Sequence, residues 1–285
     1  MFCVKKFASL VKISHTIFAM PFAFVGYFLA VRQVQAFRWE VLLPVVLCMF
    51  FARNAAMSFN RYVDRRFDAA NPRTALREIP RGVVLPSHAL LFCIANALLF
   101  VATTFFINRL CFALSPVALA LVLGYSYTKR FTALCHFVLG LGLSVAPVGA
   151  YIAVSGAFAA PALLLSALVL LWSGGFDIIY ALPDEEFDRQ QRLHSIPAAL
   201  GRKAALWLSA AAHVICCAIV LWIGVYVINN VFYWIGACLF AGCLVYQHKI
   251  VSVGDISRVN MAFAVVNGAA SIAFALFCIV GLVAV

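Results

Sequence analysis

The sequence has 285 residues, of which 66% are apolar and only 11% are charged. A soluble domain of this length carries about 25% charged and about 45–50% apolar residues, so the composition excludes a soluble globular protein and makes membrane lipid the bulk solvent. The formal net charge of +11 indicates loop arginines that face an anionic cytoplasmic leaflet or a diphosphate, and we expect no nucleic-acid partner.

Apolar segments that can cross a bilayer, which takes about 20 residues each, recur along the chain. Several links between them are short, but the links at 60–87 and 181–203 are long and charged. The chain is therefore predicted to be all-α, a polytopic membrane helical bundle of nine transmembrane helices. In chain order the expected helices are 14–31, 39–59, 88–107, 111–127, 137–155, 161–180, 204–227, 231–246 and 260–284.

Lysine and arginine are distributed unevenly between alternate links. If the N-terminus is inside, the inner segments carry 17 of these residues and the outer segments carry 3. Positive residues accumulate on the cytoplasmic side of a membrane protein. The bias therefore predicts a multi-pass protein of the cytoplasmic (inner) membrane, with its N-terminus and both long charged links in the cytoplasm.

The two long links follow the second and the sixth expected helices. Asn60 and Asp184, near the start of each link, lie 124 residues apart, and four of the expected helices fall between them. We therefore predict two four-helix halves plus one helix, with an acidic motif at the inner end of each half's second helix. Repeated halves with a site between them also occur in transporters, so the pattern alone leaves an enzyme and a secondary transporter open.

Each long link carries an acidic motif with helical spacing. Asn60, Asp64 and Asp68 are spaced in steps of four, so on a helix they share one face. Asp184 and Asp188 repeat this step in the second link. Carboxylate pairs are oxygen ligands that suit Mg²⁺, an ion that keeps several waters and commonly shares its shell with substrate phosphates. We predict that the two aspartate pairs hold Mg²⁺; the alternative is a solvated loop helix in which they pair with nearby arginines.

Two charged residues lie well away from the outer ends of expected membrane helices, where an ionisable group is a functional candidate. Asp177 precedes Asp184 by seven residues, so a continuous helix would place it on the face of the second motif. Arg53 precedes Asn60 by seven residues and shares the face of the first motif. A guanidinium there would hold a phosphate or a carboxylate; the alternative is an arginine that snorkels to the interface.

Tyr125, Lys129 and Arg130 end the fourth expected helix on the cytoplasmic side. Tyr125 and Lys129 are four residues apart and therefore face together. A lysine beside a diphosphate neutralises charge on the leaving group. The alternative is the ordinary flanking of a membrane helix by positive residues.

These motifs together resemble the UbiA superfamily of intramembrane prenyltransferases. The segment 60–82, NRYVDRRFDAANPRTALREIPRG, is similar to the family's first aspartate motif and the loop after it. The segment 177–188, DIIYALPDEEFD, followed by HSIP at 194–197, is similar to the second motif, and Tyr125 to Lys129 matches the YxxxK element. The loops are most similar to those of 4-hydroxybenzoate polyprenyltransferases, including the branch that serves menaquinone synthesis through futalosine. Glu185 and Glu186 are two acids beyond the family pattern.

The resemblance implies a single integral membrane prenyltransferase domain over 1–285, with a cavity open to the cytoplasm and to lipid. It also implies a Mg²⁺-dependent enzyme of ubiquinone or menaquinone biosynthesis. Such an enzyme transfers a polyprenyl group from polyprenyl diphosphate to an aromatic acid, 4-hydroxybenzoate or 1,4-dihydroxy-6-naphthoate, through an allylic carbocation. The acids lie at one membrane face, which favours this reading over a transporter with a site at the midplane. The expected site residues are Asp177, Lys129 and Tyr125 for catalysis, Arg53, Asn60, Lys129 and Arg130 for substrate binding, and Asp64, Asp68, Asp184 and Asp188 for the metal.

Overall fold

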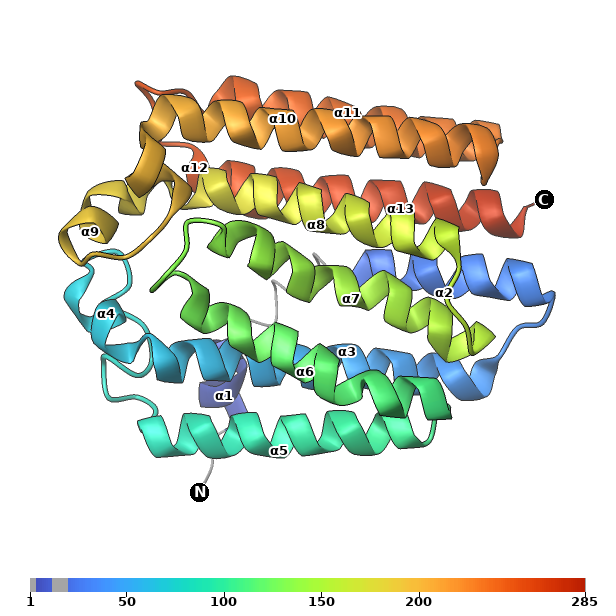
Figure 1. Ribbon diagram of the computed structural model, residues 1–285, viewed down its shortest axis with the longest axis horizontal. Coiled ribbons are helices and arrows are strands. Elements are labelled where there is room, and N and C mark those ends of the chain that lie inside the picture. Colours follow the sequence, from blue (N-terminus) through green and yellow to red (C-terminus); the bar gives the residue numbers. More distant parts are fainter. Residues whose placement is uncertain (1–3, 12–19, 285) are drawn as a thin grey trace. The chain divides into compact units, whose positions relative to one another are not determined.

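The computed structural model describes residues 4–11 and 20–284, and all regular structure in these ranges is helical (Figure 1). Eight stretches are long and apolar enough to cross a membrane. They are α3 (Trp39–Val63), α5 (Pro86–Phe105), α6 (Arg109–Thr128), α7 (Cys135–Ser155), α8 (Ala160–Tyr180), α10 (Ile196–Tyr226), α11 (Val231–Ile250), and the stretch formed by α12 (Val259–Met261), the π-helix η3 (Ala262–Val266) and α13 (Asn267–Val283).

The prediction of a polytopic helical bundle is confirmed, and each of the last eight expected helices overlaps one of these stretches. The first expected helix, 14–31, begins at residues outside the described ranges. Its described part is α2 (Met20–Val34), which has 15 residues. At about 1.5 Å per residue α2 alone is shorter than the roughly 30 Å hydrocarbon core, so the count of nine stays a prediction.

The chain divides into two compact units that do not follow the predicted halves. The first unit comprises Met1–Thr16 and Glu40–Tyr127, and the second comprises Ile17–Trp39 and Thr128–Val285. Helix α2 therefore packs with α7, α8 and α13 of the second unit. The pattern of two four-helix halves describes the order of motifs along the chain, whereas packing assigns α2 to the second unit.

In the second unit six helices are successive neighbours: α2 packs on α7, α7 on α8, α8 on α10, α10 on α11, α11 on α13, and α13 back on α2. Phe22, Trp172, Phe240 and Phe274 come from four of these helices and are almost completely buried. The ring centroids of Phe22 and Trp172 lie 5.1 Å apart, as do those of Phe240 and Phe274. Because lipid is as apolar as this core, close packing and not exclusion of water holds the helices together.

In the first unit, contacts between aromatic rings join α3 to α6, α5 to α6, and the short helix α1 (Val4–Val11) to α5. Asn54 on α3 donates from Nδ2 to Asn96 Oδ1 on α5 over 3.2 Å, and both amides are buried. Leu10 of α1 packs against Ile79 and Val84, which belong to the long link after the first aspartate motif. Helix α1 therefore supports the link that follows the motif.

Glycine allows α2 to approach α7 closely, and this contact can be tested. A Cβ atom on Gly26 would collide with the carbonyl oxygen of Pro147. We expect Gly26→Ala to lower the free energy of unfolding by about 1–3 kcal/mol, the usual cost of overpacking, and to lower the Tm in detergent. Gly149→Ala on α7 is the matched control, because no described atom lies within 4 Å of its added Cβ. Equal Tm values for the two variants would contradict the packing of α2 on α7.

Candidate functional site

The first aspartate motif spans a break between two helices. Helix α3 ends at Val63, and Asp64 is the N-cap of the six-residue helix α4 (Arg65–Ala70). The backbone keeps helical spacing through the break, because Asp64 N–H donates to Asn60 O over 2.9 Å and Asp68 N–H to Asp64 O over 2.8 Å. The Asp64 carboxylate does not cap α4 but accepts from Asn60 Nδ2 over 2.9 Å. Asn60 and Asp64 therefore lie on one side of the chain, as their spacing predicts.

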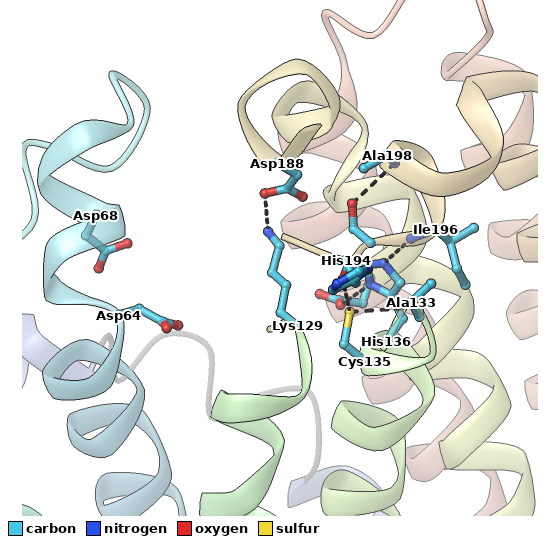
Figure 2. Close-up of polar contacts among 12 residues, drawn as sticks. Asp64, Asp68, Lys129, Ala133, Cys135, His136, Asp188, His194, Ile196 and Ala198 are labelled. Carbon is cyan, nitrogen blue, oxygen red and sulfur yellow. Dashed lines mark hydrogen bonds and ion pairs between the residues drawn. The ribbon is translucent and has the colours of Figure 1, made fainter. Parts of the chain in front are cut away.

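Asp68 is the buried member of the first pair. It is 5% exposed, and Arg77 Nη1 lies 2.6 Å from its Oδ1. Thr74 Oγ1 donates to the Asp68 carbonyl over 3.1 Å, which helps to fold the following link back over α4. Among the described residues, no hydrogen-bond donor reaches the buried Asp68 Oδ2. Figure 2 shows Asp64 and Asp68 on consecutive turns of this segment.

The second motif repeats this construction. Helix α8 ends at Tyr180, the 3-10 helix η2 (Leu182–Asp184) follows, and Asp184 is the N-cap of the six-residue helix α9 (Glu185–Gln190). The carboxylate of Asp184 does not cap α9. Asp177 and Asp184 therefore do not lie on one continuous helix, which was the condition for their sharing a face. The helix breaks because the residue before Pro183 is disfavoured in the α conformation and proline lacks an N–H.

Asp188 is completely buried and forms an ion pair with Lys129, whose Nζ lies 2.7 Å from Oδ1 (Figure 2). Burial alone would lower the pKa of Lys129, but the charge and hydrogen bond of Asp188, with a contribution from Asp184, raise it above its ordinary value of 10.5. Lys129 is therefore charged at neutral pH. Of the predicted residues, the structure brings together Lys129, Asp188 and Asp184 in the second unit.

The aspartates fit Mg²⁺ by their donor chemistry. Asp68 and Asp188 each keep a buried Oδ2 that has no hydrogen-bond partner in the described chain. A buried carboxylate oxygen without a donor is costly, and a hard cation removes that cost. No group of three or more His, Cys, Asp or Glu side chains within 4–11 and 20–284 is arranged to hold a metal. Each motif supplies a pair, which suits an ion that takes few carboxylates and completes its shell with water and phosphate.

The two extra acids of the second motif are engaged in protein contacts. Glu185 Oε1 lies 2.9 Å from Arg189 Nη2, and its Oε2 lies 2.9 Å from Arg202 Nε. Gln190 Nε2 donates to Glu186 Oε1 over 2.9 Å. Because both oxygens of Glu185 are held by guanidinium groups, this residue ties α9 to α10 and is not proposed as a metal ligand.

The first unit gathers cations near its motif. Tyr125 and Arg61 lie close enough to Arg53 to interact with it electrostatically. Arg61 also interacts with Asp68 and Arg77, is 4% exposed, and has no described hydrogen-bond partner for its buried Nε. Arg61 was not among the predicted site residues, although it precedes Asp68 by seven residues, the spacing that singled out Arg53.

Asp177 has a partner that was not among the predicted site residues. His136 Nδ1 on α7 lies 2.7 Å from Asp177 Oδ2 on α8, and the backbone N–H of Ile196 donates to His136 Nε2 over 3.3 Å. The histidine stands alone in the sequence, 41 residues from Asp177. Only the packing of α7 on α8 brings the two together, so no local pattern could have found the pair.

Hydrogen bonds connect the segment before and at the start of α7 to the loop after α9. His194 N–H donates to Lys129 O over 2.6 Å, and Cys135 Sγ donates to His194 O over 3.4 Å (Figure 2). Ser195 then caps α10 by accepting from Ala198 N–H over 3.3 Å. Arg130 is half-buried in the first of these loops. The two loops therefore hold Lys129 and Asp188 in place.

Comparisons with known proteins agree with this construction. Residues 19–277 match the UbiA prenyltransferase family. A 4-hydroxybenzoate octaprenyltransferase from Nitrosospira multiformis is 32% identical over 238 residues, which cover 84% of this chain and 81% of that protein. The apo structure of a UbiA homolog from Aeropyrum pernix K1 has a TM-score of 0.81 at 31% identity, covering 90% of this chain and 97% of that one. A UbiA homolog from Archaeoglobus fulgidus bound to GPP and Mg²⁺ has a TM-score of 0.73 at 18% identity, covering 96% and 99%, and is alike in fold.

The buried ion pair of Asp188 makes a stability prediction. Lys129→Met leaves Asp188 buried without its cation, and since the Lys129 side chain is 35% exposed we expect a moderate loss of about 1–2 kcal/mol at pH 7. The folded state raises the pKa of Lys129, so the stabilisation is present below pH 10.5 and disappears as the pH rises through the raised pKa. Thermal unfolding in detergent should therefore show a Tm difference at pH 7 that shrinks above pH 10.5.

Arg189→Ala is the matched control for this experiment. The Arg189 side chain is 53% exposed, and its partner Glu185 keeps Arg202, so its Tm should change little. A pH-independent Tm difference for Lys129→Met would show that the lysine stabilises the fold by packing and not by charge.

Proposed function

This chain belongs to the UbiA prenyltransferase family, and we propose that it transfers a polyprenyl group from polyprenyl diphosphate to an aromatic acid in quinone biosynthesis. The acceptor is of the 4-hydroxybenzoate or 1,4-dihydroxy-6-naphthoate type. The observation that carries the proposal is the pair of aspartate motifs, each with one buried and cation-paired carboxylate. The Nitrosospira multiformis relative, named for 4-hydroxybenzoate, supports an aromatic acceptor. Membership of the family favours an enzyme over a secondary transporter.

Asp64, Asp68, Asp184 and Asp188 are the proposed Mg²⁺ ligands. Their oxygen donors and the two unpartnered buried oxygens support this assignment. Bound Mg²⁺ would supply positive charge against the diphosphate of the prenyl donor. The Archaeoglobus fulgidus homolog, described with GPP and Mg²⁺ bound, supports the same pairing of ion and substrate.

Lys129 is proposed to act on the leaving group. Its charge is maintained by Asp188, and its side chain is 35% exposed, so the ammonium can reach an anion while Asp188 stays buried. Arg130 is next to Lys129 in the same loop and is proposed to add a second cation toward the diphosphate. Tyr125 is near Arg53 and Arg61, which supports a role in orienting substrate beside these cations.

Arg53 and Asn60 are proposed to bind substrate in the first unit. Asn60 already donates to Asp64 and so positions a proposed metal ligand. Arg53 lies seven residues earlier on α3, which is about 10 Å further along the helix. A guanidinium at this depth is suited to a carboxylate, because the fork of N–H donors matches both carboxylate oxygens. We therefore assign Arg53 to the acid group of the acceptor.

The proposed reaction breaks the allylic C–O bond and the ring C–H bond, and it forms a C–C bond and a bond between the base and the released proton. The allylic C–O bond cleaves, and the diphosphate leaves with the electron pair while Lys129 and Arg130 offset its charge. The ring carbon ortho to the acceptor's hydroxyl attacks the allylic cation, and the ring then loses its proton to a base. Asp177 is the proposed base, since it is 24% exposed and is the one aspartate of the expected site not assigned to the metal. Products are the prenylated acid, diphosphate and one proton.

We also propose that the N-terminus and the two aspartate motifs face the cytoplasm in the inner membrane. The support is the excess of lysine and arginine in the segments predicted to be inside. The prenyl chain then lies among apolar helices while the charged diphosphate stays near the aqueous face.

The aromatic transfer itself is tested with the purified protein, Mg²⁺, a polyprenyl diphosphate and a panel of 4-hydroxybenzoate and dihydroxynaphthoates. Mass spectrometry should detect a prenylated product with at least one acid, and EDTA should abolish it. We expect Asp64→Ala, Asp68→Ala, Asp184→Ala and Asp188→Ala each to lose at least about 100-fold in kcat/KM, the scale of removing groups that stabilise transition-state charge. Glu186→Ala, on the same helix as Asp188, is the control and should keep most activity. Full activity in two of the aspartate variants would contradict the metal assignment.

A second experiment separates the two proposed cation roles. Lys129→Met should lower kcat about 100-fold with every acceptor, because leaving-group charge develops in the transition state. Arg53→Ala should raise the KM for the aromatic acid about 10-fold or more, since a charged hydrogen bond present in both ground and transition states is lost. Saturation curves for each substrate measure both effects. If Arg53→Ala instead weakens binding of the prenyl diphosphate alone, Arg53 belongs to the diphosphate site.

A further inference from the structure

We propose that His136 is a positioning residue: it holds one oxygen of Asp177 so that the other oxygen is presented to the ring proton of the acceptor. The proposal rests on the proposed function, because it assumes that Asp177 is the base. It is carried by two contacts of one buried imidazole ring, one to Asp177 and one to the backbone of Ile196.

The contact with Ile196 fixes the tautomer of His136. A backbone N–H can only donate, so His136 Nε2 must accept in the 3.3 Å contact with Ile196 N. Nε2 is then unprotonated, and in a neutral ring Nδ1 carries the hydrogen. Nδ1–H therefore donates to Asp177 Oδ2 over 2.7 Å. The histidine is a donor of fixed direction and does not itself exchange a proton in the reaction.

Burial divides the pair into an inner and an outer member. The His136 side chain is 3% exposed, whereas that of Asp177 is 24% exposed. A substrate can reach the aspartate but not the imidazole. Asp177 Oδ2 is committed to the histidine, so Oδ1 is the oxygen that remains to accept a proton. His136 therefore influences proton removal only by holding the carboxylate of Asp177.

The ring itself is held from three elements. It extends from the first turn of α7, contacts Asp177 near the end of α8, and accepts from Ile196 at the start of α10. Ser195 caps the same turn of α10, and Cys135 bonds to the preceding His194 carbonyl (Figure 2). A carboxylate on a free side chain would rotate about its last bond. A donor anchored to backbone holds it within the narrow range of directions that proton transfer needs.

Two isosteric replacements separate the two contacts of the ring. In His136→Asn the Nδ2–H group takes the place of Nδ1–H and keeps the bond to Asp177, but the contact with Ile196 is lost. In His136→Gln the Oε1 atom takes the place of Nε2 and can accept from Ile196, but no donor faces Asp177. We expect His136→Asn to keep kcat within about 3-fold of the wild type, and His136→Gln to lose about 10–100-fold, the range for a lost catalytic orientation. The KM values for both substrates should change less than 3-fold.

A kinetic isotope effect identifies the step that is slowed. The acceptor is deuterated at the ring carbon that becomes prenylated. If ionisation of the donor limits the wild type, its isotope effect on kcat is near 1, whereas His136→Gln should make proton loss limiting and raise the effect to about 2 or more. Lys129→Met is the matched control, because it slows ionisation and should show no isotope effect.

The outcomes separate this proposal from the function on which it rests. No prenylated product from the wild type with any acid would refute the proposed function. An active wild type with equal losses in His136→Asn and His136→Gln, or with no isotope effect in His136→Gln, would overturn the role of His136 alone. Circular dichroism and thermal unfolding of both variants confirm that the compared proteins are folded, and a His136→Gln loss fully matched by a lowered Tm would also count against positioning.

Discussion

A carboxylate buried in a protein whose solvent is lipid must be given a cation, and this constraint organises both aspartate motifs. Asp188 is completely buried and Asp68 is 5% exposed. A buried charge without a partner costs several kcal/mol. Arg77 reaches back from the link after α4, and Lys129 comes from the loop before α7. The path of both loops follows from the need to deliver these two cations.

The two motifs meet this constraint with the same local construction. In each, a membrane helix stops, an aspartate occupies the N-cap of a six-residue helix without capping it, and a second aspartate four residues later is buried. An N-cap carboxylate normally accepts the exposed N–H groups of its helix. Here Asp64 instead accepts from Asn60, which directs the carboxylate away from the helix it begins. At Asp64 and Asp184 the helix lacks the stabilising hydrogen bond of an N-cap side chain, a pattern expected where a side chain is required for function.

Much of this could be predicted from the sequence, and the limits have physical reasons. Hydropathy predicted nine membrane helices, of which the last eight overlap stretches that can cross a membrane, and steps of four predicted that Asn60 and Asp64 lie together, because both signals are local. The end of the helix at Tyr180 could also have been predicted from the sequence, because Pro183 disfavours continuation of an α-helix. The partners Arg77, His136 and Ile196 were not predictable by spacing, because loop folding or helix packing brings them to their aspartates. The assignment of α2 to the second unit depends on the close approach of Gly26 to Pro147, which no periodicity reveals.

The second unit holds two acid–base pairs with opposite burial, and this contrast supports the roles proposed for them. In Lys129–Asp188 the acid is buried and the base is 35% exposed, so the group open to solvent is a cation on a flexible stem. In His136–Asp177 the base is buried and the acid is 24% exposed, so the accessible group is a carboxylate held by a fixed donor. A cation that can shift toward an anion suits a departing diphosphate, whose charge grows as the C–O bond breaks. A carboxylate that cannot rotate suits removal of a proton from one ring carbon. The accessible member of each pair is thus matched to one of the two charges that the proposed reaction creates, the negative leaving group first and the ring proton afterwards.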